Sequence, residues 1–255
     1  MIVVVPCFNE AGRLAVDRFE SALAELADVA FVFVDDGSTD ATAATLEALR
    51  TLAPDRVRVL RLPRNVGKGE AVRAGVLDAL QQDARYIGYW DADLATPLTA
   101  IGTFRDVLEA RPGVEMVFGA RVQLLGRTIR RRALRHYLGR AFATVVSTML
   151  RLGIYDTQCG AKLFRVTASL RELFREPFLT RWVFDVEILA RLIRARRGTN
   201  RPQPDAVIYE YPLETWVDVP GSKVRGLDFV RAIGGVLRIY GHYLAPRAWT
   251  APRPT

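Results

Sequence analysis

The chain has 255 residues, of which 50% are apolar and 25% charged, as expected for a globular protein with a substantial core. It has two cysteines, Cys7 and Cys159, and no Cys/His cluster, which argues against a disulfide framework or a structural zinc site and fits a reducing compartment. The net charge of +8 makes phosphates, acidic lipid or nucleic acid the candidate partners.

Neither a targeting segment nor a membrane span is expected from the sequence. Met1–Pro6 lacks the basic region and the cleavage pattern of a signal peptide, so we expect a first strand there. No apolar run reaches the roughly 18 to 20 residues that cross a bilayer. We therefore expect a cytoplasmic protein, either soluble or attached peripherally to the inner face of the cell membrane.

From residue 2 to residue 119 the sequence predicts alternating strands and helices. The strands are expected at Ile2–Val5, Ala30–Val34, Arg56–Leu62, Tyr86–Trp90 and Glu115–Gly119. The helices are expected directly after Cys7–Glu10, over Ala41–Leu52, from Asn65–Gly69 to Leu80, and over Pro97–Ala110. This order predicts an α/β fold with a mostly parallel sheet and helices on both faces.

The alternation stops after Ala120. The remaining elements are expected to be helices over His136–Leu152, Phe184–Arg196 and Gly226–Tyr243, with one strand over Ala206–Tyr211. No internal repeat or linker is present. We therefore expect a single domain over residues 1–245, followed by a flexible, proline-rich tail over residues 246–255.

Acidic residues follow three of the expected strands: Glu10, then Asp35 with Asp36, then Asp91 with Asp93. The carboxyl ends of parallel strands meet at one edge of a sheet, where ligands bind in open α/β folds. Carboxylates without His or thiolate suit Mg²⁺ or Mn²⁺, and Mg²⁺ usually takes one or two protein carboxylates and completes its shell from phosphates. Asp91 and Asp93 are thus expected to hold a divalent metal against a nucleotide diphosphate, with helix capping as the alternative.

Two other nucleotide-binding motifs are missing. The loop Asn65–Gly69 is not a Walker A motif, because Leu62 and Gly69 occupy the positions of its first Gly and its Ser or Thr. The segment Pro6–Glu10 after the first strand contains no glycine, so it is no dinucleotide fingerprint. The ATPase and dehydrogenase classes therefore lose their main support.

Several motifs resemble those of family 2 glycosyltransferases with the GT-A fold. They are Val5–Glu10, Val34–Asp40, Asn65–Gly69 and Asp91–Asp93. The later motifs look like those of the polyprenyl-phosphate hexose synthases, above all the dolichyl-phosphate β-glucosyltransferase branch. They are Asp156–Phe164, Arg181–Glu187, and Trp216 with Gly221–Lys223. The resemblance runs from Ile2 to about Lys223. It implies a GT-A type, Rossmann-like sheet and a metal-dependent, inverting transferase that moves a hexose from a nucleotide sugar, with UDP-glucose as the donor.

The resemblance also implies roles for single residues. Residues 1–120 would form the nucleotide-sugar-binding half and residues 121–245 the acceptor-binding half. The metal ligands would be Asp91 and Asp93, and the catalytic residues Asp93, Arg121 and Asp185. The implied substrate-binding residues are Pro6, Phe8, Glu10, Asp35, Asp36, Lys68, Asp91, Ala92, Arg131, Asp156, Gln158 and Lys223. In this set Asp36 would accept a hydrogen bond from the nucleobase, Lys68 would close the nucleoside pocket, and Lys223 would contact the diphosphate.

The acceptor decides whether a general base is needed. A polyprenyl phosphate is already an oxyanion near neutral pH, so it needs cations that dock it, and arginines such as Arg121 and Arg131 serve that purpose. A saccharide or other hydroxyl acceptor needs a base, for which Asp185 is the candidate. Asp185 has the alternative of a structural role, in which it orients Arg181 or Lys162.

Basic residues gather in two regions. Residues 121–140 contain seven arginines and no acid, and a second cluster runs from Arg191 to Arg201. A peripheral contact with a membrane surface or a solvated basic face would explain them. Nucleic acid is not expected as a partner, because Tyr137 alone interleaves an aromatic ring with the first cluster. The apolar stripe of the last helix is open to two interpretations, core packing or interfacial binding.

Overall fold

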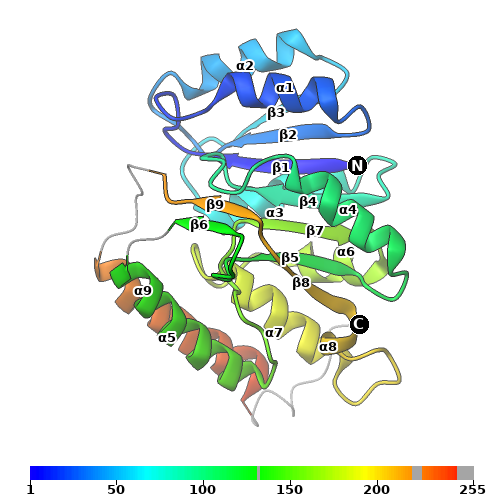
Figure 1. Ribbon diagram of the computed structural model, residues 1–255, viewed down its shortest axis with the longest axis vertical. Coiled ribbons are helices and arrows are strands. Elements are labelled where there is room, and N and C mark those ends of the chain that lie inside the picture. The colour runs from blue at the N-terminus through cyan, green and yellow to red at the C-terminus, as the bar shows by residue number, and fades with distance from the viewer. Residues whose placement is uncertain (131–132, 220–225, 246–255) are drawn as a thin grey trace.

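The computed structural model describes residues 1–130, 133–219 and 226–245, and a seven-stranded sheet lies at its centre (Figure 1). The strands lie in the order β3-β2-β1-β4-β7-β5-β8. Their bounds are β1 Ile2–Cys7, β2 Ala30–Asp35, β3 Val57–Arg61, β4 Tyr86–Trp90, β5 Met116–Ala120, β7 Ala161–Arg165 and β8 Ile208–Pro212. Only β7 runs antiparallel to its neighbours β4 and β5 among these strands. The expected α/β fold with a mostly parallel sheet is confirmed.

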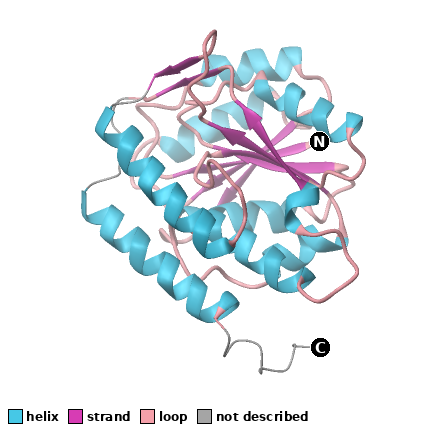
Figure 2. Ribbon diagram, turned by 60° about the horizontal axis from the view of Figure 1, so that its bottom comes forward, coloured by secondary structure: helices cyan, strands magenta, loops and turns pink. Residues whose placement is uncertain are grey.

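Helices cover both faces of the sheet (Figures 1 and 2). One face carries α1 Val16–Glu25, α2 Thr42–Leu52 and α4 Ala100–Ala110. The opposite face carries α3 Lys68–Ala79, α6 Ala168–Arg175 and α7 Phe184–Arg196, and beyond them α5 Ala133–Leu150 and α9 Gly226–Ile239 with its π-helical continuation η1 Tyr240–Leu244. The long helices α5 and α9 run along the same side of the molecule in both views.

The strand β1 shows why the core has two parts. Its side chains alternate between faces, so that Val3 and Val5 pack with the α1, α2 and α4 layer, while Ile2 and Val4 pack with the α3 layer. Gly75 lets α3 lie close to the sheet, because a Cβ at this position would be 2.3 Å from Val4 Cγ1. This near contact sets the distance between the sheet and the helix that begins at Lys68.

The first half departs from the expected elements at two helix starts. The helix expected directly after Cys7–Glu10 begins only at Val16. Asn9 has a φ of 50°, and the Glu10 carbonyl accepts from the amides of Arg13 and Leu14, so this stretch is a turn. The helix expected from Pro97 begins at Ala100. In both cases a loop after a strand is longer than the sequence pattern suggests.

The second half contains elements that the periodicity did not predict. A short parallel pair joins β6 Thr128–Arg130 to β9 Thr215–Val217. The strand expected over Ala206–Tyr211 begins at Ile208, after the short helix α8 Pro204–Val207. Over the described stretches of the chain, no helix is both long and apolar enough to cross a membrane.

Candidate functional site

The acidic residues predicted to converge do meet at one edge of the sheet. β2, β1 and β4 are neighbours and run parallel, so their carboxyl ends lie together. Asp35 ends β2, Asp36 follows it, and Asp91 is the first residue after β4. The edge is therefore negatively charged where three strands end, which is where ligands bind in open α/β sheets.

The turn after β4 fixes Asp91 and Asp93. The Asp91 amide donates to the Gly160 carbonyl at 2.9 Å, and Asp93 Oδ1 accepts from the Ala95 amide at 3.1 Å. Leu94, which follows Asp93, has a φ of 52°, and this left-handed conformation folds the chain back sharply. Position 160 requires glycine because Asp91 packs against it: a Cβ there would be 1.9 Å from Asp91 Oδ2.

Lys68, the first residue of α3, is the nearest cation to this pair of acids. Its Nζ lies 2.5 Å from Asp91 Oδ1. Burial alone would lower the pKa of Lys68, but the charges of Asp91, Asp185 and Asp93 raise it above the ordinary value. Burial and the charge of Asp91 raise the pKa of Asp93. Lys68 thus offsets part of the negative charge of Asp91 and Asp93.

The donor set at this turn fits Mg²⁺ or Mn²⁺. Two carboxylates two residues apart supply hard oxygen ligands, and among the described residues no group of three His, Cys, Asp or Glu is placed to complete an all-protein cage. Asp91 Oδ1 is buried and receives no well-directed hydrogen bond within the described residues, although Lys68 is close. An ion held here would need oxygens from a ligand such as a phosphate.

Asp36 holds the loop that leads into α3. Its carboxylate accepts from the Val66 amide at 2.7 Å, the Gly67 amide at 2.9 Å and Asn65 Nδ2 at 3.0 Å. Burial raises the pKa of Asp36, although these backbone hydrogen bonds oppose the shift. The predicted contact of Asp36 with a nucleobase is untested, and the Asp36 carboxylate uses most of its hydrogen-bonding capacity within the protein.

The loops after β1 and β2 are joined to each other. Asn9 donates its amide to Ser38 Oγ at 2.9 Å and accepts from the Thr39 amide at 2.8 Å. Asp35 Oδ1 accepts from the Ser38 amide at 2.9 Å. Glu10 forms a bidentate ion pair with Arg13, whose Nε and Nη2 lie 2.8 and 2.7 Å from Oε2. Pro6 and Phe8 stand at the end of β1 beside this joined pair of loops.

Asp185 is buried and engaged. Its side chain lies on the first turn of α7, the residue is 4% exposed, and Oδ1 accepts from Lys162 Nζ at 2.6 Å and from the Tyr89 hydroxyl. Lys162 is fully buried and also donates to the carbonyls of Thr157 and Cys159. This arrangement supports the structural role for Asp185, with Lys162 as the residue that it orients; within the described residues, no hydrogen bond or ion pair joins Asp185 to Arg181.

Arg121 is fixed by Asp156 rather than left extended. Its Nε and Nη2 donate to the two carboxylate oxygens at 2.6 and 2.7 Å. The central carbon of the guanidinium lies 5.3 Å from the centroid of the Trp216 ring. Burial alone would lower the pKa of Arg121, but the charge and hydrogen bonds of Asp156 raise it. Glu210 on β8 accepts from the Asp156 amide at 2.8 Å and so holds the Asp156 loop. Arg121 is therefore a permanent, oriented cation.

Buried polar atoms without a partner lie in the loop after Asp156. Thr157 Oγ1 and Gln158 Nε2 are buried and have no hydrogen-bond partner within the described part of the chain. Gln158 donates its own amide to Asp156 Oδ1 at 3.1 Å, so the loop is held while its side-chain amide is not. Such groups are costly to bury, so each calls for an explanation such as a bound water or ion or a catalytic role.

Two of the predicted site residues, Arg131 and Lys223, lie outside the described residues, so their roles stay predictions.

The cluster from Arg191 to Arg201 is not a single surface patch, because Arg191 and Arg196 are buried. Arg196 Nη2 lies 2.5 Å from Glu115. A solvated basic face is therefore wrong for Arg191 and Arg196, whereas Arg197 and Arg201 are exposed.

Several residues of the site were not singled out from the sequence. Gly160 contacts Asp91, Tyr89 contacts Asp185, and Glu210 holds Asp156. An acid within the strand Ile208–Pro212 was a usable signal for Glu210, because a carboxylate in a strand needs a partner. Gly160 gives no signal of its own, since its importance comes from a strand 70 residues away in sequence.

Comparison with known proteins places the chain among sugar transferases. Residues 2–171 match the family model described as Glycosyl transferase family 2. The dolichyl-phosphate beta-glucosyltransferase of Dictyostelium discoideum is 33% identical over 95% of this chain and 74% of its own length. The protein of the same name from Saccharomyces cerevisiae is 31% identical over 95% of this chain and 74% of its own length.

The fold matches solved structures of lower sequence similarity. Glucosyl-3-phosphoglycerate synthase from Mycobacterium tuberculosis, crystallised with Mn²⁺, UDP and glucosyl-3-phosphoglycerate, superposes with a TM-score of 0.64 at 19% identity. The match covers 94% of this chain and 79% of that one. The same enzyme was also crystallised with Mg²⁺ and UDP, with a TM-score of 0.63. At this identity the likeness concerns the fold.

Proposed function

The chain belongs to glycosyl transferase family 2, and we propose that it transfers glucose from UDP-glucose to a polyprenyl phosphate of the dolichyl type, with inversion and with the help of Mg²⁺ or Mn²⁺. The relatives named above support the sugar and the acceptor. The fold neighbours support UDP and a divalent metal. The site residues must then explain how this chain performs such a reaction.

The burial and the hydrogen bonds of Asp185 are the observation on which the proposed acceptor rests. A hydroxyl acceptor needs an accessible base, whereas Asp185 is 4% exposed and shares Oδ1 between Lys162 and Tyr89. Its ion pair with Lys162, at 2.6 Å, leaves this carboxylate occupied within the protein. A phosphate acceptor brings its own negative oxygen and needs no base. The geometry therefore favours the phosphate over the saccharide hydroxyl.

Asp91 and Asp93 would hold the metal, which when bound stabilises the charge that builds up on the departing diphosphate. Asp91 is presented by its amide contact with Gly160, and Asp93 by its contact with Ala95. Lys68 remains cationic beside them and adds a second positive group at the diphosphate. Asp36 holds the Asn65–Gly67 loop as one wall of the nucleoside side.

Arg121 would orient the acceptor phosphate. Asp156 holds the guanidinium plane through two hydrogen bonds, so that the group enters the reaction already ordered. Gln158 Nε2, buried without a partner within the described residues, is a second donor in the same loop. These groups bind a phosphate without removing a proton from it, which is what an oxyanion nucleophile requires.

The acceptor is a lipid, so we place the enzyme peripherally on the cytoplasmic face of the membrane. Large apolar side chains are exposed on α5, α9, η1 and the loop before β6: Leu124, Leu125, Tyr137, Leu138, Val145, Ile233, Leu237 and Tyr240. Exposed arginines flank them, Arg130 on β6 and Arg151 after α5, and residues 121–155 contain no acid. Apolar and basic groups on one side fit an anionic lipid surface.

The test is a transfer assay with labelled UDP-glucose, Mg²⁺ or Mn²⁺, and a short polyprenyl phosphate in detergent or vesicles. We expect a lipid-linked glucose whose formation stops with EDTA. The acceptor arms contain polyprenyl phosphate, the corresponding unphosphorylated prenol, and a free disaccharide. Transfer to the saccharide alone would refute the lipid phosphate, and the absence of product with every UDP-, GDP- or dTDP-hexose would refute transfer to this acceptor.

A further inference from the structure

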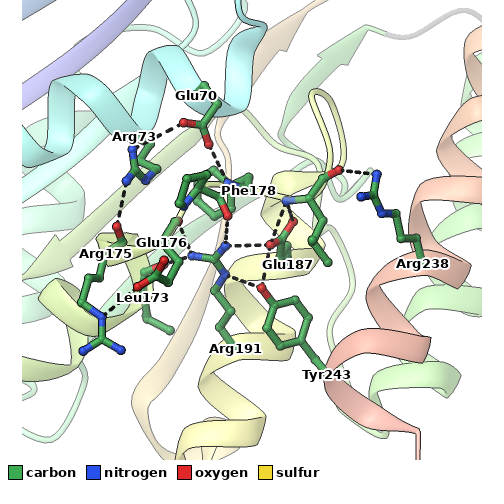
Figure 3. Close-up of polar contacts among 12 residues, drawn as sticks. Glu70, Arg73, Leu173, Arg175, Glu176, Phe178, Glu187, Arg191, Arg238 and Tyr243 are labelled. Atoms are coloured by element: carbon green, nitrogen blue, oxygen red, sulfur yellow. Dashed lines mark hydrogen bonds and ion pairs between the residues drawn. The ribbon is translucent and has the colours of Figure 1, made fainter. Parts of the chain in front are cut away.

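Residues 175–181, which we call the bridging segment, join three separate parts of the molecule. They begin at the last residue of α6 and end before α7, and they lie between the start of α3 and the C-terminal helix (Figure 3). None of these residues belongs to the predicted substrate-binding set. Their position would allow them to couple the C-terminal helix to the start of α3.

The first group of contacts ties the bridging segment to α3. Glu70 Oε1 accepts from the Phe178 amide at 2.6 Å, and Arg73 Nη2 donates to the Arg175 carbonyl at 2.7 Å. The Gly69 amide donates to the Arg181 carbonyl at 3.1 Å. These contacts fall on the first turns of the helix that begins at Lys68, the partner of Asp91.

The second group ties the same segment to α7 through a buried ion pair. Glu187 is fully buried and accepts from the Leu179 amide at 2.9 Å and from Arg191 Nη2 at 2.8 Å. Arg191 also donates to the carbonyls of Glu176 and Pro177 at 2.8 and 2.6 Å. Every one of these charges is matched by hydrogen bonds, as burial of an ion pair requires.

The third group brings in the C-terminal helix. The Tyr243 hydroxyl donates to Glu187 Oε1 at 2.9 Å and accepts from Arg191 Nε at 3.1 Å. Arg238 on α9 donates to the Leu179 carbonyl at 3.2 Å. Gly235 permits the close packing, since a Cβ there would be 2.8 Å from Val183 Cγ2 and 3.3 Å from Thr180 Cγ2.

At its other end the bridging segment reaches the loop that Asp36 holds. Arg181 Nη2 donates to the side-chain oxygen of Asn65, whose Nδ2 in turn donates to Asp36. Gly67 is packed against the Arg181 side chain, and a Cβ at Gly67 would be 2.9 Å from Arg181 Nε. The charge of Arg181 also acts on Asp36, where it lowers the pKa against the effect of burial.

We propose that Tyr243 and Glu187 are positioning residues for the donor side: they lock the bridging segment between α7 and η1, so that Arg181 and the first turn of α3 hold the Asn65–Gly69 loop in its ligand-binding conformation. The C-terminal helix, which carries part of the exposed apolar surface, is thereby coupled to the nucleoside side of the site. The inference rests on the proposed function in one respect, the assignment of that loop to the nucleotide.

The variant Tyr243→Phe keeps the ring and removes one hydroxyl. We expect UDP to bind about fivefold more weakly, by calorimetry with Mn²⁺ present, because the hydrogen bonds of the Tyr243 hydroxyl with Glu187 and Arg191 are both lost. The donor KM should rise with it, while the acceptor KM is unchanged. Tyr209→Phe is the matched control, because the Tyr209 hydroxyl makes no hydrogen bond within the described part of the chain and its ring stacks on Arg111.

Amide hydrogen exchange without any ligand tests the coupling separately from the function. Tyr243→Phe should raise exchange in residues 176–181 and also in residues 64–69. The double variant with Arg181→Ala should bind UDP no more weakly than Arg181→Ala alone, because both act along one path. Unchanged exchange at 64–69, or additive losses of UDP affinity, would overturn the proposal. If the wild type binds no UDP, the proposed function fails while the exchange result still decides the coupling.

Discussion

The two sides of the site hold their carboxylates by different means. Near β2, Asp35 and Asp36 accept mainly from backbone amides of neighbouring loops. Farther along the sheet edge, Asp156 and Asp185 are paired with the side-chain cations Arg121 and Lys162. Glu10 is the exception on the first side, because it pairs with Arg13.

The difference has a chemical consequence. Backbone amides stabilise a carboxylate without cancelling its charge, so Asp36 stays a negative group that shapes a loop. Ion pairs instead fix the direction of a cation, so that Arg121 is held ready for an anionic ligand. We infer that the first side is built for a nucleoside and the second for phosphate. Changes on the two sides should therefore fail in different ways.

The largest effect is expected between the two sides, at the proposed metal ligands Asp91 and Asp93. Asp93→Asn should lower transfer by about 10²- to 10³-fold, the cost of losing one preorganised electrostatic contact. Mn²⁺ binding, followed by electron paramagnetic resonance, should weaken in parallel while circular dichroism is unchanged. Asp17→Asn is the control, since Asp17 is an exposed acid on α1. Full activity of Asp93→Asn would contradict a metal role.

Breaking the acceptor-side ion pair should cost stability as well as activity. Asp156→Asn leaves Arg121 without its counter-charge, which should lower the free energy of unfolding by roughly 3 kcal/mol. Urea denaturation measures this loss. Glu47→Gln removes an exposed pair with Arg50 and should cost less than about 1 kcal/mol. Equal losses in the two variants would mean that the Arg121 pair is no more than a surface contact.

The apolar surface beyond the acceptor side should govern lipid binding. Leu237→Ser should weaken cosedimentation with anionic vesicles by about tenfold, because one buried leucine side chain contributes about 1.5 kcal/mol. Leu52→Ser is a matched control on α2, since Leu52 is 63% exposed and Leu237 is 64% exposed. An equal effect of both substitutions would argue against a defined membrane face.

The smallest effect is expected at Asp36. Asp36→Asn replaces one acceptor oxygen by a donor and should cost about 1 kcal/mol of unfolding free energy at pH 7. Because the pKa of Asp36 is raised in the folded state, its charged form is disfavoured there and the penalty is relieved as the pH falls. The wild type should therefore gain stability relative to the variant between pH 7 and pH 4. The opposite trend in urea titrations would show that the amide hydrogen bonds outweigh burial.

Much of the first half could be predicted from the sequence, because its signals are local. Short apolar runs that are followed by acids identify β1, β2 and β4, and strands joined by helices must lie parallel in the sheet. Parallel neighbours end at one edge, so Asp36 and Asp91 had to be close. The predicted start of α1 is too early, because Asn9 adopts a left-handed conformation that the sequence pattern does not predict.

The sequence by itself determined the class of fold, the acids at the strand ends and the motifs that resemble family 2. The tertiary structure decided which partner each charge has. The antiparallel strand β7 brings Gly160 against Asp91 and Lys162 against Asp185, and η1 brings Tyr243 to Glu187 across 56 residues. Such contacts join segments whose local patterns are independent of one another. They exist only once the sheet order is set, so no window of sequence contains them.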